Sequence, residues 1–273
     1  MAMTVHPTAL VEEGANLADG VDVGPFCIVG RDAVLRANVR LASHVVVEGL
    51  TEVGERTVVH SHAVIGGGAQ IRNHDPRGMR LRIGSDNVIR ESVTISTGSH
   101  GGKGITVVGD RCYLMAGSHV GHDCIVGNDV TLSNAVQLGG HVQLEDGVIM
   151  GGLSAIQQFG RVGRYAFVSG LSGIAVDVIP YGSVLGTHAR LYGLNLVGLR
   201  RRNVPRENIH ALRAAYRFIF EADSGTIHEN ARRAGENWPD VPEVQHVVAF
   251  ILADAKRPIC PARRRDSQAD QEG

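Results

Sequence analysis

The side chains with the clearest capacity for chemistry lie in one short segment, Ser-His-Val-Gly-His-Asp-Cys, at residues 118–124. Within it, His122 directly precedes Asp123. A neutral imidazole beside a carboxylate suits a general base that takes a proton from a hydroxyl or an amine. A glycine N–H close by would stabilise the oxyanion that forms when such a nucleophile attacks an acyl carbonyl group. The segment indicates acyl-transfer chemistry, provided that the fold supplies that glycine.

A repeat of six residues runs through most of the chain and must position these side chains. Aliphatic residues recur at every sixth position from Val5 to Ile65, and apolar residues do so again from Val108 to Ile174. A small residue follows each of them four positions later, and glycine often comes directly after. This period fits neither a helix nor a simple strand alternation. It predicts a β-solenoid of triangular section, with the aliphatic residue inside, the small residue at the corner and three hexapeptides in each coil.

The length of a coil brings further groups to the His122 corner. One coil of about 18 residues along the chain places Gly140 beside His122 and His141 beside Asp123. A second coil adds Gln158 to the column that contains His122 and Gly140. We therefore expect three polar groups and a bare glycine amide to gather within about 10 Å.

The inward and corner positions of the same coil fall on Val120 and Cys124. The side chains of His119, His122 and Asp123 are then expected to point outward from the solenoid. Polar residues on the outside of a solenoid are common, so the stacking of several groups, rather than any single histidine, is what favours a site.

The chain divides into three parts. Residues 1–185 are predicted to form the β-solenoid, with loops near residues 66–82 and 96–107 where the repeat is interrupted, and loops on a rigid scaffold often carry binding residues. Residues 186–258 have helical periodicity. Residues 259–273 are expected to form a disordered tail.

Several local signals support the helical part. The segment 205–221 has an apolar face that is typical of an amphipathic helix. Thr226 with Glu229, and Asp240 with Glu243, have the spacing of capping boxes that would begin two more helices.

Composition excludes several classes of function. The chain has 273 residues, with 27 Lys and Arg against 28 Asp and Glu and a formal net charge of −1. This balance provides no extended positive field, so we expect neither nucleic-acid binding nor stable membrane insertion. Neither a secretory signal nor an apolar run of about 18 residues is present, so we expect a cytoplasmic protein.

A metal site is the other sharp use of these histidines, because histidine is a common zinc ligand. The γ-class carbonic anhydrases, also hexapeptide proteins, hold zinc through an HxxxxH spacing, whereas this chain has HxxH beside a carboxylate that better suits a base. The four cysteines show no metal-ligand spacing, and no metal is expected. Lys103 and Lys256 are the only lysines, and the sequence assigns them no function.

Five segments resemble the UDP-N-acetylglucosamine O-acyltransferase family of lipid A biosynthesis. They are HPTALVEEGANL, IRESVTIS, GSHVGHDCIVGN, LGGHVQL and GLNLVGLRRR, and the similarity runs from His6 to about Arg202. The resemblance implies a left-handed parallel β-helix followed by a helical domain. It also implies a homotrimer with active sites between neighbouring β-helices.

The resemblance further implies a reaction and a set of site residues. The family transfers an R-3-hydroxyacyl chain from acyl carrier protein to the 3-hydroxyl of a UDP-sugar nucleotide. No cofactor is implied beyond the phosphopantetheine of the carrier. His122 corresponds to the general base, Asp123 to its orienting partner and Gly140 to the oxyanion donor. The positions expected to bind substrate are His119, His141, Gln158, Gly170, which would leave room for a long acyl chain, Asn195, Arg201 and Arg202.

Four positions depart from the family pattern. Ile71 and Asn73 stand where the family has an aspartate and a lysine, and Ser96 and Gln157 stand where it has histidines. The acceptor is therefore open, and N-acylation of a UDP-3-amino-3-deoxy sugar is the alternative. The sequence also leaves the acyl chain length open. A zinc-dependent hydratase and a non-catalytic scaffold that binds acyl carrier protein are more remote. The arginines at 200–202, with Arg206, indicate either a solvated helix end or a docking site for phosphates or an acidic carrier.

Overall fold

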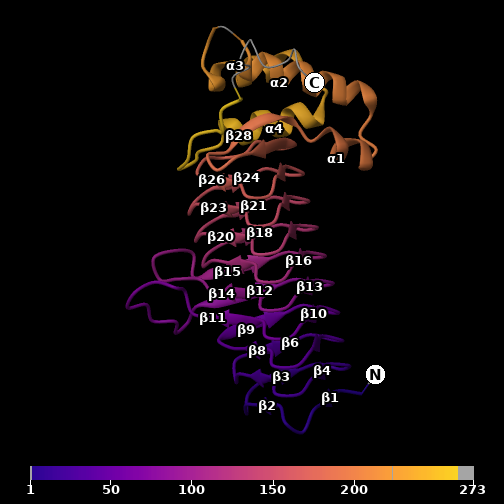
Figure 1. Cartoon of the computed structure of the whole chain (residues 1–273), viewed down its shortest axis with the longest axis vertical. Helices are drawn as coiled ribbons and strands as arrows, with labels where there is room; N and C mark the ends of the chain where they lie inside the picture. Colours follow the sequence, from indigo (N-terminus) through magenta and orange to yellow (C-terminus); the bar gives the residue numbers. More distant parts are fainter. Residues whose placement is uncertain (1, 223, 264–273) are drawn as a thin grey trace.

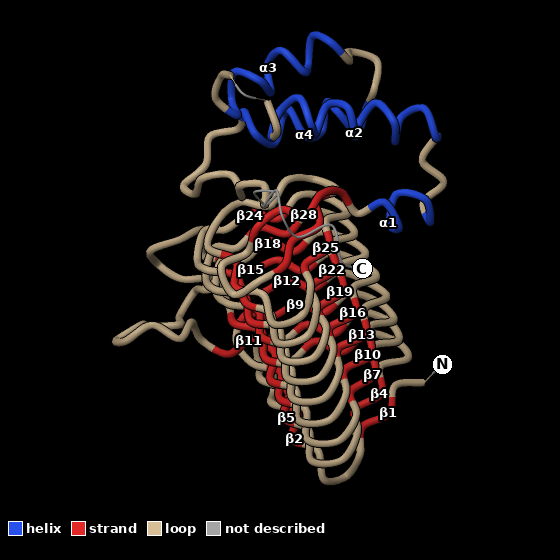
Figure 2. Tube along the Cα trace, turned by 45° about the horizontal axis from the view of Figure 1, so that its top comes forward, coloured by secondary structure: helices blue, strands red, loops and turns tan. Residues whose placement is uncertain are grey.

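The computed structural model describes residues 2–222 and 224–263. In this part of the chain a tall β-solenoid is followed by helices that sit over its C-terminal end (Figure 1). The solenoid is triangular in section, and each of its three faces is one sheet whose strands stack along the prism (Figure 2). The sequence prediction of hexapeptide coils is confirmed.

Sheet A contains β1 (Thr4–Val5), β4 (Asp22–Val23), β7 (Arg40–Leu41), β10 (Val58–Val59), β13 (Val88–Ile89), β16 (Tyr113–Leu114), β19 (Thr131–Leu132), β22 (Ile149–Met150), β25 (Phe167–Val168), β27 (Gly182–Leu185) and β28 (Arg190–Leu194). Sheet B contains β2 (Leu10–Val11), β5 (Ile28–Val29), β8 (Val46–Val47), β11 (Val64–Gly67), β14 (Thr94–Ser96), β17 (His119–Val120), β20 (Gln137–Leu138), β23 (Ala155–Ile156) and β26 (Gly173–Ile174). Sheet C contains β3 (Asn16–Leu17), β6 (Val34–Leu35), β9 (Leu50–Val53), β12 (Arg80–Ile83), β15 (Ile105–Val108), β18 (Ile125–Val126), β21 (Gln143–Leu144) and β24 (Arg161–Val162).

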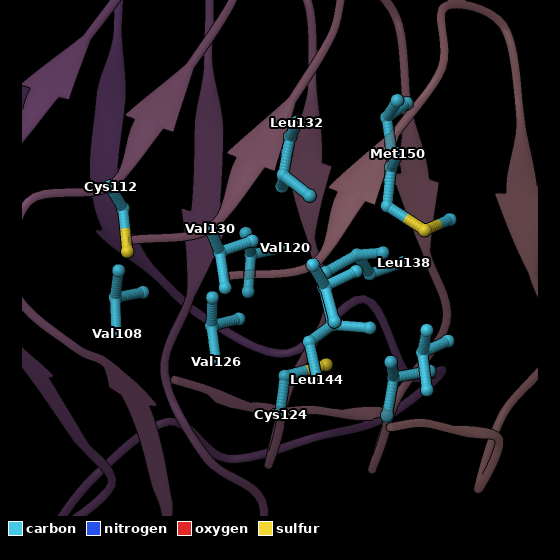
Figure 3. Packing of buried hydrophobic residues seen from close by; sticks show 14 of the residues in the cluster. Val108, Cys112, Val120, Cys124, Val126, Val130, Leu132, Leu138, Leu144 and Met150 are labelled. Atoms are coloured by element: carbon cyan, nitrogen blue, oxygen red, sulfur yellow. The ribbon is translucent and has the colours of Figure 1, made fainter. Parts of the chain in front are cut away.

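The predicted inward column forms the core. Leu114, Leu132 and Met150 stack along sheet A with none of their surface exposed. Figure 3 shows Leu132 and Met150 in the same core as the corner residues Cys112 and Cys124. Strands of only two residues are stable here because each backbone pairs with the coils on both sides, while one aliphatic side chain per strand is buried. The core is thus a filled prism rather than a channel.

Two coils are longer than the rest, at the two places where the sequence predicts loops. Regular coils contain 18 residues, but 30 residues separate Thr57 from Asn87 and 25 separate Asn87 from Cys112, which are equivalent positions in successive coils. The extra residues form the two loops that project beside β11, β14 and β15 (Figure 1). Between Gly98 and Gly104, the second loop folds back over the corner that carries Asp123.

The last parallel strand of sheet A, β27, pairs with β25 and ends at Leu185. β27 and β28 form an antiparallel hairpin that continues sheet A to Leu194. The helices follow as α1 (Leu196–Arg201), α2 (Arg206–Phe220), α3 (Ile227–Asn237) and α4 (Pro242–Leu252).

One of the two predicted capping boxes is present. At α3 the Thr226 side chain accepts from the N–H of Glu229, whose carboxylate accepts from the N–H of Thr226. The prediction for Asp240 and Glu243 was wrong, because Val241 is the N-cap of α4. The Glu243 carboxylate instead accepts from Asn208 of α2.

After α4 the chain returns to the solenoid. Ile259 bridges to Asp177, and Ala262 bridges to Leu191. Residues 259–263, which were expected to belong to a disordered tail, therefore have regular backbone partners, and residues 264–273 lie outside the described residues. Within the described ranges, none of the helices combines the length and apolar character needed to cross a bilayer.

Candidate active site

A hydrogen-bonded histidine–aspartate pair forms the corner between sheets B and C. The Nδ1 atom of His122 lies 2.8 Å from Oδ2 of Asp123. The two residues fill the turn between β17 and β18, where Asp123 has a left-handed φ of 58°. Aspartate tolerates this conformation better than most residues. The turn geometry therefore allows adjacent residues to meet side chain to side chain.

The Asp123 side chain is fully buried, although it lies outside the apolar core of the prism. The second loop covers it, and Oδ1 accepts from the N–H groups of Ser99 and Gly104 while Oδ2 accepts from the Ser99 hydroxyl at 2.6 Å. Burial raises the pKa of Asp123, but the hydrogen bonds from Ser99 and His122 outweigh burial and hold the pKa below its ordinary value. The carboxylate is therefore ionised and fixed in place before any ligand binds.

His141 lies one coil further on, as predicted. Its N–H donates to the carbonyl oxygen of His122 at 2.8 Å, and its ring meets the His122 ring edge-on with centroids 5.0 Å apart. Its Nε2 is 3.9 Å from Oδ2 of Asp123. Burial is the largest cause of a lowered pKa at His141, so the neutral imidazole is favoured.

Gly140 lies against the other edge of the His122 ring. A Cβ atom at this position would come within 2.4 Å of Nε2 and 2.5 Å of Cε1 of His122, closer than any real contact. Only glycine therefore allows the imidazole to take this orientation. Among the described residues no hydrogen-bond acceptor takes the Gly140 N–H, so this donor is available beside the ring.

A cavity of about 320 Å³ opens on sheet B beside His122. Its lining brings together four of the predicted residues, His119, His122, Gly140 and Gln158. His119 is held by Thr94, whose Oγ1 is 2.8 Å from its Nδ1, and burial lowers its pKa. The cavity can therefore present one base, one free N–H and several polar groups to a bound molecule. Asp123 and His141 instead line a second cavity on sheet C.

The remaining predicted residues lie outside the His122 cavity. Asn195 is the N-cap of α1, where its side chain accepts from the N–H of Gly198 and donates to the carbonyl oxygen of Tyr165. Arg202 packs its guanidinium 4.0 Å from the centroid of the Tyr165 ring, and Arg201 is exposed. Gly170 is exposed, and a Cβ atom at this position would lie 3.1 Å from the carbonyl oxygen of Gly152. Within a single chain, these four residues do not line the His122 cavity and lie closer to the C-terminal end of the solenoid.

Several residues that support the corner were missed by sequence reasoning. Ser99 was placed in a predicted loop but without a role, and its spacing from Asp123 gives no signal. Phe159 lies one coil beyond His141, so the same step that found His141 could have found it. Its ring stacks on His141 with centroids 4.4 Å apart and planes 10° apart. Lys256 packs on the outer face of Phe159, and nothing in the sequence pattern connects the two.

The geometry also bears on the metal alternative. One ligand atom each from His122, Asp123 and His141 lie within 4.8 Å of one another. However, the Asp123 oxygens already accept three hydrogen bonds from the second loop in addition to the one from His122. To coordinate a metal ion, the Asp123 carboxylate would have to give up some of these hydrogen bonds. The arrangement fits a carboxylate that orients an imidazole.

Comparisons with known proteins agree along nearly the whole chain. Residues 177–260 match the model of the Udp N-acetylglucosamine O-acyltransferase domain 2 family, and residues 105–140 match the bacterial transferase hexapeptide family. The acyl-(acyl-carrier-protein)–UDP-N-acetylglucosamine O-acyltransferase of Caulobacter vibrioides is 53% identical over 96% of this chain and 99% of its own. The enzyme of the same name from Rhizobium johnstonii is 47% identical over 95% of each chain.

A solved structure extends the agreement to three dimensions. The UDP-N-acetylglucosamine acyltransferase of Campylobacter jejuni has a TM-score of 0.90 and 35% identity, over 95% of this chain and all of its own. The expected left-handed parallel β-helix with a helical C-terminal part is confirmed.

Proposed function

The chain belongs to the UDP-N-acetylglucosamine O-acyltransferase family, and from this premise we propose how its own residues carry the reaction. The family reaction is the first step of lipid A biosynthesis. It moves an R-3-hydroxyacyl chain from the phosphopantetheine thioester of acyl carrier protein to the 3-hydroxyl of UDP-N-acetylglucosamine. The cavity beside His122 is the place where the sugar hydroxyl and the thioester meet.

His122 is the general base of this reaction. Its Nδ1 faces the buried carboxylate of Asp123, which favours the tautomer with the proton on Nδ1 and leaves Nε2 as the proton acceptor. Nε2 takes the proton of the sugar hydroxyl as the oxygen attacks the thioester carbon. The new C–O bond forms, and the Asp123 carboxylate stabilises the imidazolium.

Gly140 stabilises the tetrahedral intermediate, and His122 completes the transfer. The Gly140 N–H, beside Nε2, donates to the oxyanion derived from the thioester carbonyl. Collapse of the intermediate breaks the C–S bond, and the sulfur of phosphopantetheine leaves with the proton that His122 holds. The products are the 3-O-acyl sugar nucleotide and the free thiol of the carrier.

The observation that carries the proposal is that Gly140, whose N–H has no acceptor among the described residues, lies against Nε2 of His122 in one cavity. We expect His122→Ala to reduce kcat by at least about a hundredfold, because proton transfer by a positioned base contributes this much or more. His228→Gln, an exposed histidine of α3, is the matched control and should keep wild-type kcat. Transfer by the His122 variant at a rate near that of the control would remove the base assignment.

The acceptor is tested separately. Ser96 lines the cavity where the family pattern has a histidine, whereas Ile71 and Gln157 are exposed and do not belong to its lining. Assays of UDP-N-acetylglucosamine and its 3-amino-3-deoxy analogue side by side, with the same acyl carrier protein, compare O-acylation with N-acylation. The proposal expects the hydroxyl acceptor to have the higher kcat/KM.

The carrier docks in a groove between α1 and α2. This hollow of about 830 Å³ is lined by four basic side chains, Arg200, Arg206, His210 and Arg213, together with apolar residues and Asn203. Among the residues that the structure describes, no acidic side chain lines it. An acidic carrier protein complements such a groove. The groove contains Arg200 and Arg206, two of the arginines for which the sequence left a solvated helix end and a docking site as alternatives.

The functional unit is a homotrimer. Sheet B carries the His122 cavity at one edge, and at its other edge Leu153 and Leu171 are 64% and 68% exposed. Exposed leucines in one column favour contact with another subunit. A neighbouring copy over this face would close the cavity and bring its own residues to the substrates.

A further inference from the structure

The segment that returns from α4 to the solenoid contacts the coil of Gln158 and Phe159, which lies toward the C-terminus from the coil of His122. Residues 253–258 follow Leu252, and the Asp177 N–H donates to the carbonyl oxygen of Pro258 at 2.8 Å. We call residues 254–257 the strap. Asp254 and Lys256 line the cavity of about 470 Å³ on sheet C, opposite Asp123 and His141. The last part of the chain therefore reaches a corner formed more than a hundred residues earlier.

The strap holds two successive residues of that coil. Arg257 donates from Nε and Nη2 to the carbonyl oxygen of Gln158, at 3.1 Å and 2.9 Å. Lys256 places Nζ 3.9 Å from the centroid of the Phe159 ring. Gln158 lines the His122 cavity, and Phe159 stacks on His141. Two neighbouring residues of the strap thus contact two neighbouring residues of the site.

The rings transmit this contact to the catalytic pair. Lys256 covers one face of Phe159, and the other face lies parallel to His141 at 4.4 Å. His141 in turn presents its edge to His122 and its Nε2 to Asp123. A cation over an aromatic ring is attracted by the negative face of the ring, which restricts its position. Lys256 therefore restricts Phe159, and Phe159 restricts His141.

The charges around His141 oppose one another: Asp123 favours its protonated form, whereas His122, Lys256 and Lys103 disfavour it. Asp123 faces His141 as an anion, and His122 lies at the same corner of the prism. Lys103 of the second loop and Lys256 of the strap contribute positive charge near His141. Arg161 and Asp254 complete the charged groups of the cavity, and Arg161 is paired with the buried Asp177 at 2.6 Å. Lys103 and Lys256 are the only lysines in the chain, and both disfavour a protonated His141. When His141 is neutral, the Asp123 carboxylate has no second imidazolium to pair with, and its charge stabilises a protonated His122 alone.

We propose that Lys256 is a positioning residue for the acyl transfer: the strap presses Phe159 onto His141 and so keeps the His122–Asp123 pair aligned with the substrate. The kinetic part of this inference rests on the proposed function. Lys256 acts on the catalytic pair through two rings, those of Phe159 and His141. Lys103 provides a comparison, because it supplies a charge near His141 while the cation over the Phe159 ring comes from Lys256.

The test compares Lys256→Met, Lys256→Arg and Lys103→Met in the full-length enzyme. At about pH 8, where histidine is neutral, Lys256→Met should lower kcat about three- to fivefold with little change in KM for the sugar nucleotide, the size expected for loss of a partly exposed cation–π contact. Lys256→Arg keeps a cation over the ring and should restore kcat. Lys103→Met should keep wild-type kcat at this pH.

A titration of His141 by NMR, in histidine-labelled protein without substrate, gives an independent readout. Lys256→Met and Lys103→Met should both raise the pKa of His141, because each removes a nearby cation. Wild-type kcat in Lys256→Met, or an equal loss in Lys103→Met, would overturn the positioning role. An enzyme that acylates no UDP-sugar would defeat the proposed function instead. The titration would still test the strap, and an unshifted His141 in Lys256→Met would overturn it.

Discussion

Replacing Gly140 by alanine adds a single methyl group at the point where the geometry of the site is tightest. The new Cβ would lie 2.4 Å from Nε2 of His122. An ordinary contact requires about 3.5 Å, so the ring must move by about 1 Å or rotate away from the cavity. The pair His122–Asp123 resists this movement because Asp123 is held by Ser99 and Gly104.

Misplacement of a reacting group by about 1 Å can cost about a hundredfold in rate, which corresponds to about 2.7 kcal/mol of transition-state stabilisation. We therefore expect Gly140→Ala to lower kcat about a hundredfold while the solenoid stays folded. Steady-state transfer from an acyl carrier protein, with thermal unfolding of the same samples, measures both quantities.

Gly30→Ala is the matched control for this experiment. Gly30 lies on the same edge of the prism, between sheets B and C, but in an earlier coil. A Cβ there would come no closer than 3.4 Å to Glu48, an ordinary contact, so activity should be retained. Wild-type kcat in Gly140→Ala would refute the argument, because the imidazole would then act from a position other than the one beside the glycine amide.

Three further perturbations test other parts of the account. Acidification should lower the free energy of unfolding in two steps. Burial lowers the pKa of His119 and His141, so below about pH 6.5 the unfolded chain binds protons that the folded chain does not, and stability falls. The lowered pKa of Asp123 causes a further loss of stability below about pH 4. Denaturation midpoints across this range measure it, and a flat profile between about pH 7 and 5.5 would contradict the histidine part. Arg213→Glu should raise KM for the acyl carrier protein about tenfold and make this KM less sensitive to salt, while KM for the sugar nucleotide stays unchanged. Equal effects on the KM values of both substrates would argue against the groove as the docking site. Leu171→Lys should dissociate the proposed trimer in sedimentation experiments, and an unchanged oligomer would place the subunit contact elsewhere.

The solenoid was predictable because its signal is local and repeated. Each coil needs one aliphatic side chain inside each face and a small one at each corner, and the sequence repeats this pattern from Val5 to Ile65 and again from Val108 to Ile174. A fixed period also converts sequence distance into spatial distance, so the sequence alone places Gly140 and His141 beside His122 and Asp123. The capping box at Thr226 was found for the same reason, since its partners are three residues apart.

Contacts made by the irregular segments could not be predicted in this way. The sequence determined the prism, its coil length and the identity of the residues stacked at one corner. Only the tertiary structure decided that Asp123 is buried beneath Ser99 and that Lys256 reaches Phe159. The physical reason is that a repeat fixes the path of the backbone within a coil, whereas the path of a loop or a returning strap depends on packing against residues that carry no fixed sequence spacing from it.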